Sequence, residues 1–381
     1  MKAKLLLTAV IGLCLVALLV GACAKPAPAP TTPAPTTKPS PSPTASPSPT
    51  ATPKPSPTQT PLEVKTWRIS TQAPGNWTHT IGTGIARVVD KYAQGVKLLI
   101  TIAPASGATH YLYEKNELDA AYGGNLDLLN VYNNKGAFAT QPVSYRAYQG
   151  LYLATTGTFF LVKKDNTSMN SFKDLAGKKL FPFTSGSGTY TAVQAALTAT
   201  GVWDKISDRQ MGITAIADAF KTNAIDATAG YVTGYDPPPF LQDLDRQVQL
   251  KVLVPTDEEK QAISKVPGTA IASLPVAIMS QPLNVSSVWG FGNGYAWHFG
   301  PNEDEERVYQ IVKALIEHAD EVKAISPLSL GAFAENPQKV PTSVYDATPG
   351  VPIHPGVAKY FKEKGWWKDS WTIGKIYPRS K

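Results

Sequence analysis

Beyond residue 62, short apolar runs alternate with longer stretches in which apolar residues recur every three to four positions. This alternation predicts strands and helices in turn, and so an α/β fold. The first series predicts strands over 67–71, 97–103 and 119–122, and helices over 78–92 and 108–115. The folded part of the chain is therefore expected to begin with a βαβαβ unit.

A second series follows the apolar run at 145–155. It predicts strands over 158–162, 179–183 and 225–231, and helices over 171–175, 190–200 and 215–222. Two series of this kind predict two lobes with a cleft between them. We expect lobe 1 to comprise about residues 63–155 and 270–381, including the segment 275–279 and a helix over 303–319, and lobe 2 to comprise about residues 156–269.

The first 23 residues have the order of a secretory signal. Lys2 and Lys4 precede an apolar run over 5–20, and Gly21, Ala22 and Cys23 follow it. A transmembrane anchor is the alternative, but the run is shorter than the roughly 20 residues that cross a bilayer comfortably. The ending V-G-A-C resembles a bacterial lipobox. We therefore predict a lipoprotein signal peptide over 1–22, lipidation of Cys23 and an extracytoplasmic, lipid-anchored location.

A proline-rich segment follows the lipidation site. Residues 24–61 hold 14 of the 33 prolines and contain no aromatic residue, Asp or Glu, so they cannot build a core. Alternating Pro, Ala, Ser and Thr favour polyproline II, at roughly 3.1 Å per residue and an upper reach on the order of 100 Å. We interpret residues 23–62 as a spacer that holds the domain away from the membrane. An inert, glycosylated stalk is a compatible alternative.

Charge and cysteine content exclude several functions. The whole chain carries +7, but residues 63–381 carry 31 basic against 29 acidic residues, and no basic run marks a nucleic-acid surface. Nucleic acid is therefore not a predicted partner. Cys14 lies in the signal and Cys23 is consumed by lipid, so disulfides, thiolate catalysis and cysteine-ligated metals are excluded for the mature domain.

Two turns rich in small residues follow predicted strands. Ser185-Gly186-Ser187-Gly188-Thr189 lies between a strand and a helix, where backbone N–H groups and hydroxyls suit an anion. An ordinary glycine-rich turn with a Ser or Thr N-cap is the alternative. The segment is no P-loop, since the Lys-Ser/Thr pair is missing. The second turn, at 105–109, contains Ser106 and Thr109. One turn in each series predicts a binding site that faces across the cleft.

Aromatic and polar residues extend this candidate site. Asn76, Trp77 and His79 cluster after the first strand, and Tyr231 ends a later one. A second aromatic cluster, over 289–299, is interpreted as core or hinge. The five histidines show no metal-binding spacing and no G-x-S-x-G turn is present, so we predict no catalysis, metal or cofactor. A Ser-His-Asp site assembled from distant parts stays open.

Four blocks, in order, carry a resemblance to a known family over residues 65–365. They read ASGATHYLYEKNELDAAYGGNLD (105–127), SFKDLAGKKLFPFTSGSGTYTAVQAAL (171–197), AFKTNAIDATAGYVTGYDPP (219–238) and VPIHPGVAKYFKEKGWW (351–367). The chain resembles the TAXI family, the extracytoplasmic solute receptors of TRAP transporters. The resemblance implies a two-lobed periplasmic-binding-protein-like fold of the second type, which closes on a small organic anion and delivers it to TRAP permease subunits.

The resemblance also implies site residues. Matching positions place Ser106 and Thr109 in the first-lobe turn, Asn125 near the end of the next strand, and the three hydroxyl residues of 185–189 in the second-lobe turn. Family members often carry two tyrosines that hold an amino-acid-like ligand where this chain has Thr78 and His79. The resemblance therefore implies a small organic anion, carboxylate or amino-acid-like, without fixing which. The alternatives are an ABC-importer receptor of the same fold and an extracytoplasmic sensor or enzyme.

Overall fold

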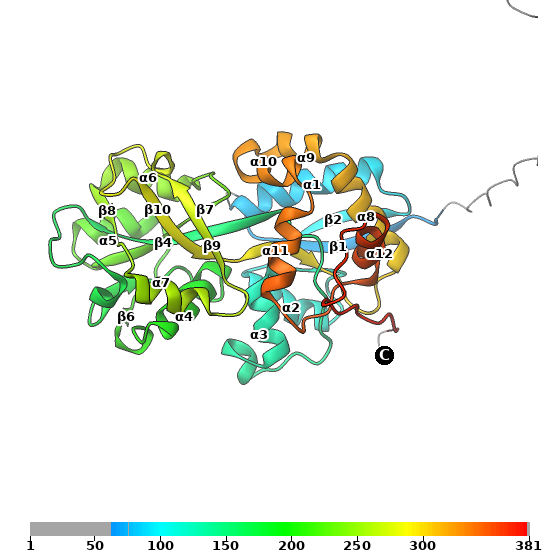
Figure 1. The fold of residues 1–381 in the computed structure, drawn as a ribbon, viewed down its shortest axis with the longest axis horizontal. Helices are drawn as coiled ribbons and strands as arrows, with labels where there is room; N and C mark the ends of the chain where they lie inside the picture. Colours follow the sequence, from blue (N-terminus) through cyan, green and yellow to red (C-terminus); the bar gives the residue numbers. More distant parts are fainter. Residues whose placement is uncertain (1–61, 75, 379–381) are drawn as a thin grey trace, which may run out of the picture. The chain divides into compact units, whose positions relative to one another are not determined.

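The computed structural model describes residues 62–74 and 76–378, which belong to one compact unit (Figure 1). The predicted signal peptide, Cys23 and nearly all of the predicted linker lie outside the described residues. No helix in the described part of the chain has the length and apolar character needed to cross a bilayer.

The first lobe begins with the expected βαβαβ unit. Its elements are β1 Lys65–Thr71, α1 Trp77–Tyr92, β2 Val96–Ile102, α2 Ser106–Glu114 and β3 Ala121–Gly124, followed by α3 Asn125–Asn133. Strands β1 and β2 are parallel along their full length, and a single parallel bridge joins Ile69 of β1 to Ala120, beside β3. The antiparallel strand β11, Gly294–His298, then pairs with β3. The strand order of this lobe is therefore β2-β1-β3-β11.

The second lobe repeats this order. It contains β4 Ala154–Lys163, β5 Lys179–Phe181, α4 Gly188–Ala199, β6 Ser207–Asp208, α5 Ile216–Lys221, β7 Ala227–Thr233, α6 Pro239–Gln247, β8 Leu250–Val252 and α7 Asp257–Ser264. Strands β6, β5 and β7 are parallel neighbours, and β4 lies antiparallel to β7. Two lobes with this order form a periplasmic-binding-protein-like fold of the second type, so the predicted fold class is confirmed.

The later segments are divided between the lobes. Strands β9 Ala270–Pro275 and β10 Ser287–Gly292 form an antiparallel pair, and β10 also contacts β4. We expected residues from 270 onward to return to lobe 1, but Leu274, Ile278 and Met279 pack in the second-lobe core with Phe159. Their side chains complete that core because β9 and β10 extend the β4 edge. The return to the first lobe therefore begins at β11.

The C-terminal helices cover the first lobe. They are α8 Glu305–Glu317, α9 Ala319–Ile325, α10 Pro327–Glu335, α11 Lys339–Ala347 and α12 Pro355–Glu363. Short 3₁₀ helices lie at Gly136–Ala139, Phe172–Leu175, Trp203–Lys205, Ile213–Ala215 and Val276–Ile278. The expected helix over 303–319 is α8, which begins at its N-cap Asp304 and ends before His318.

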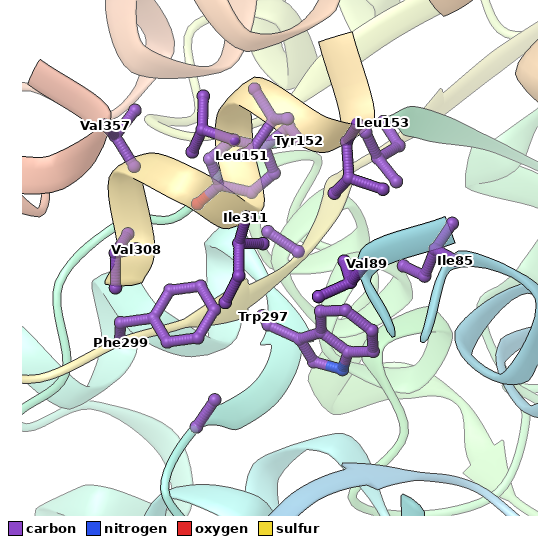
Figure 2. Close-up of a cluster of buried hydrophobic side chains, with 14 of the residues drawn as sticks. Ile85, Val89, Leu151, Tyr152, Leu153, Trp297, Phe299, Val308, Ile311 and Val357 are labelled. Atoms are coloured by element: carbon purple, nitrogen blue, oxygen red, sulfur yellow. The ribbon is translucent and has the colours of Figure 1, made fainter. Parts of the chain in front are cut away.

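Separate cores hold the two lobes. The first-lobe core packs α1 and α8 against β11, with Trp297 and Phe299 at its centre (Figure 2). Two further clusters fill the second lobe, and Trp289 and Phe291 pack in one of them. The aromatic cluster at 289–299 therefore divides between both cores. Strand β4 runs between the lobes in Figure 1 and, with the β10–β11 segment, connects them.

Candidate functional site

A pocket lies where the two lobes meet, and we call it the interlobe pocket. It is lined by Gln72, Asn76, Trp77, Thr78, Thr156, Phe183, Ser187, Gly188, Thr189, Tyr231, Thr233 and Tyr295. Five of the sequence-predicted residues are brought together here: Asn76, Trp77, Ser187, Thr189 and Tyr231. The pocket volume is about 20 Å³, which is room for about one water molecule. A larger ligand therefore requires the lobes to move apart before it enters.

Two helices, one from each lobe, begin at this pocket. Asn76 caps α1, and its Oδ1 accepts a hydrogen bond from Thr78 N at 3.1 Å. Ser187 caps α4, and its Oγ accepts one from Tyr190 N at 3.2 Å. The amides that follow donate to the backbone of the capping residues: His79 N and Thr80 N to Asn76 O, and Thr191 N to Ser187 O. Each helix end also carries a partial positive charge of roughly half an elementary charge. Together they favour a negatively charged group between them.

The Thr233 hydroxyl is an independent sign of a ligand. Thr233 ends β7, lines the pocket and is only 1 % exposed. Its Oγ1 has no hydrogen-bond partner among the described residues. A buried hydroxyl without a partner costs about 1–3 kcal/mol. A ligand acceptor in the pocket would remove this cost.

The electrostatics of the pocket are nearly neutral. None of the described residues that line it is Lys, Arg, His, Asp or Glu. Burial raises the pKa of both Tyr231 and Tyr295, so their phenols stay protonated and are able to donate hydrogen bonds. The Tyr295 ring stacks on Tyr122, with centroids 5.7 Å apart. Positive potential in the pocket therefore comes from the helix ends rather than from basic side chains.

The remaining predicted residues lie outside the interlobe pocket. Ser106 Oγ donates to Asp127 Oδ2 at 2.8 Å, and Thr109 Oγ1 donates to backbone carbonyls of Ser106 and Tyr122. His79 Nδ1 lies 3.1 Å from Thr71 Oγ1. These side chains serve internal contacts of lobe 1.

Asn125 and Ser185 are also outside the pocket lining. Asn125 is buried; its Nδ2 donates to Gly268 O at 2.7 Å and its Oδ1 accepts from Gly294 N at 2.8 Å. It thereby ties α3 to the segments on either side of β9 and β10. Ser185 is exposed, and its backbone N donates to Gln210 Oε1. Both therefore stay predictions as ligand contacts.

Asp127 links the lobes, and sequence reasoning missed it. Its Oδ1 accepts a hydrogen bond from Thr191 Oγ1 of α4 at 2.9 Å, and its other oxygen accepts from Ser106. Burial raises the pKa of the Asp127 carboxyl. A second link is the backbone bond from Gly107 N to Gly186 O. The two small-residue turns thus contact each other across the lobes. The first turn does not line the interlobe pocket, whereas Ser187 and Thr189 of the second turn do.

Three of the missed lining residues, Thr156, Thr233 and Tyr295, are ordinary hydroxyl or aromatic residues on strands. Thr156 lies on β4, and its Oγ1 bonds Asn293. Phe183 is the exception with a recognisable feature, since its φ of 94° is unusual for a bulky residue. Strained residues of this kind cluster at functional sites. The residues around Phe183 and Thr156 in the sequence give no sign that either side chain lines a pocket.

A small cavity, separate from the interlobe pocket, lies in the first-lobe core. It holds about 30 Å³ and is lined almost wholly by apolar side chains, Ile81, Ile85 and Leu315 among them. We interpret it as a packing defect of the core shown in Figure 2. Within residues 62–74 and 76–378, no three His, Cys, Asp or Glu side chains are grouped to hold a metal ion.

The family comparison places most of the chain in one family. The model described as the NMT1-like family matches residues 69–365. The chain belongs to this family. No curated protein matches the chain. This match does not distinguish the TAXI receptors named by the sequence resemblance, so the TRAP assignment stays a prediction.

Eight solved structures that resemble this NMT1-like chain share 11–18 % sequence identity with it. One is a putative L-cystine ABC transporter from Listeria monocytogenes (16 % identity, 71 % of this chain and 97 % of that chain, TM-score 0.41). Another is a probable amino-acid ABC transporter extracellular-binding protein from Bacillus subtilis (14 %, 72 % and 100 %, 0.43). A third is the periplasmic aliphatic sulphonate binding protein from Escherichia coli (16 %, 79 % and 93 %, 0.39). Likenesses this distant assign neither a ligand nor a transport partner to this chain.

Proposed function

We propose that this NMT1-like protein is an extracytoplasmic solute-binding protein that captures a small organic anion in the interlobe pocket without chemical conversion. One arrangement carries the proposal. Helix starts from both lobes and the unpartnered Thr233 hydroxyl converge on one pocket. The pocket contains donors suited to a carboxylate or a similar group. None of its described lining residues has a side chain suited to act as a general acid or base near pH 7.

Ligand capture then follows from the division of contacts between lobes. An anion that touches both α1 and α4 makes its full set of contacts only in the closed form. Its differential affinity for the closed form shifts the equilibrium toward closure. A membrane permease can recognise the closed form, because a surface that spans both lobes changes when they close.

The transport partner is a membrane permease, and two classes are candidates. The sequence resemblance favours TRAP permease subunits, while ABC-importer permeases are the alternative. Reconstitution of the protein in vesicles with each type of permease separates them. Uptake through an ABC importer requires ATP, whereas uptake through a TRAP permease requires an ion gradient. We also propose that lipid on Cys23 anchors the protein outside the cytoplasm.

The central test removes the unpartnered hydroxyl. Thr233→Val keeps the side-chain shape and deletes Oγ1. Thr158→Val is the matched control, because Thr158 lies on the neighbouring strand β4, is fully buried and also has an unpartnered Oγ1, but does not line the interlobe pocket. Neither variant should lower the free energy of unfolding, since each removes an unsatisfied buried hydroxyl.

The two variants should differ in ligand binding. The ligand is first identified by mass spectrometry of what denaturation releases from the purified protein, and its affinity is then measured by calorimetry. A hydrogen bond to a charged group contributes about 1.5–3 kcal/mol, so Thr233→Val should weaken binding roughly ten- to a hundredfold. Thr158→Val should leave affinity unchanged. Equal affinities for Thr233→Val and the parent protein would remove the interlobe pocket from the binding site, and conversion of the ligand would establish an enzyme instead.

A further inference from the structure

A second, larger pocket adjoins the interlobe pocket, and we call it the flanking pocket. It has a volume of about 410 Å³, within the usual range of small-molecule sites. Three residues, Asn76, Phe183 and Tyr231, line both pockets. The two pockets are therefore neighbours that share one wall.

The flanking pocket differs from the interlobe pocket in chemistry. Its second-lobe wall presents Ile213, Ile216, Phe240 and Leu244. Its acidic side chain, Asp243, is exposed and paired with Arg246. Apolar surface that faces solvent in a pocket is stabilised when an apolar group covers it.

Aromatic rings form the shared wall. Phe183 and Tyr231 contact each other at 5.4 Å between centroids, and Phe240 contacts both, at 5.4 and 5.6 Å. Phe183, which also has a positive φ that is unusual for a bulky residue, lies at the junction because it lines both pockets. A ligand that extends from one pocket into the other must pass beside these rings.

The interlobe pocket indicates the charge of the ligand group that it would hold, called here the head group. Two helix ends together offer about one positive charge, and none of the described lining residues adds a full one. A singly charged head group matches this potential, whereas a dianion would leave charge uncompensated in a closed pocket.

We propose that the ligand is an amphipathic organic monoanion, with its carboxylate-like head in the interlobe pocket and its apolar tail in the flanking pocket. This inference rests on the proposed function and names its substrate class. The head group provides the contacts with both lobes. The tail covers the apolar second-lobe wall past Phe183.

Straight-chain alkanoates test this inference. Acetate, butanoate, hexanoate and octanoate are titrated calorimetrically into the chain lacking residues 1–61, which lie outside the part that carries both pockets. Each buried methylene should raise affinity up to about fourfold, and so up to roughly 200-fold from butanoate to octanoate. Octylammonium has the same tail and the opposite charge, and it should not bind. Affinities that do not rise with length, or preferential binding of octylammonium, would overturn the inference.

Two substitutions locate the tail. Ile213→Glu places a charge at the solvent-exposed side of the flanking pocket, where Ile213 is 37 % exposed, so folding should be unaffected. It should weaken octanoate binding at least tenfold and butanoate binding much less. Val254→Glu is the matched control, because Val254 is 42 % exposed in the same lobe and lines neither pocket. Equal effects of the two variants would place the tail elsewhere and overturn the inference.

The outcomes separate this inference from the proposed function. Thr233→Val should weaken every alkanoate by a similar factor. Length-independent affinities that are still lowered by Thr233→Val would reject the tail assignment and leave the head site standing. If no alkanoate binds, the monoanion class is wrong, while the released natural ligand and Thr233→Val still test the proposed function.

Discussion

A single methyl group at residue 188 should hold the lobes apart. Gly188 is the first residue of α4, and a Cβ built there would lie 2.1 Å from Tyr295 Oη of the other lobe. Real Cβ atoms essentially never come within 3.0 Å of another heavy atom in this way. Gly188→Ala therefore requires the two groups to separate by about 1 Å. Tyr295 stacks on Tyr122, which restrains its ring, so we expect the lobes to open rather than the ring to move aside.

The magnitude follows from the cost of overpacking. Inserting a methyl group into a packed contact costs about 1–3 kcal/mol, which here destabilises the closed form alone. Ligand affinity should fall roughly five- to 150-fold. Helix α4 should not be weakened, because Ala is a better helix former than Gly by up to about 1 kcal/mol. Gly331→Ala is the matched control, since Gly331 is also helical and a Cβ there meets nothing within 4 Å.

Pulsed electron paramagnetic resonance can report the opening directly. Both cysteines of the chain precede residue 62, so in the chain lacking residues 1–61 spin labels attach only at introduced cysteines. Lys115→Cys and Asp204→Cys provide one exposed position in each lobe. Gly188→Ala should shift the distance distribution away from that of the parent protein, and Gly331→Ala should not. Coincident distributions for the Gly188→Ala and parent proteins, with unchanged ligand affinity, would refute the closed-contact reasoning.

Three further predictions follow from the sequence and the lobe contacts. Cys23→Ala should abolish membrane association and leave a soluble, ligand-competent domain; fractionation with membranes at high salt would contradict lipidation. Thr191→Val removes the hydrogen bond to Asp127 across the lobes, so the same spin labels should report a larger open population, and an unchanged distribution would show that this bond does not favour closure. Burial lowers the pKa of His110 to about 4 and of His354 to about 3. As the pH falls below 6.5, these histidines are therefore protonated in the unfolded chain before they are protonated in the folded protein. The free energy of unfolding should fall by up to about 3 kcal/mol per histidine as the pH drops from 6.5 to 4. Denaturant unfolding at pH 7 and pH 4.5 measures this, and equal midpoints would contradict it.

Local pattern was enough to predict the order of strands and helices. The βαβαβ start and the Ser187 turn before α4 are encoded in residues close to one another in the chain, because apolar spacing and helix caps act over a few positions. The absence of thiols after Cys23 is likewise a property of composition. The two successive series of strands and helices predict the two-lobed fold class.

The lining of the site depended on contacts between distant segments. Thr233 lines the interlobe pocket only because β7 ends opposite the start of α1, and an isolated threonine carries no sign of this in its neighbours. Ser106 satisfied the sequence criteria for an anion site, yet its hydroxyl bonds Asp127 inside the fold. Likewise, only packing shows that Leu274 belongs to the second-lobe core. Sequence determined which elements form, whereas tertiary structure decided which polar groups were satisfied internally and which were left for a ligand.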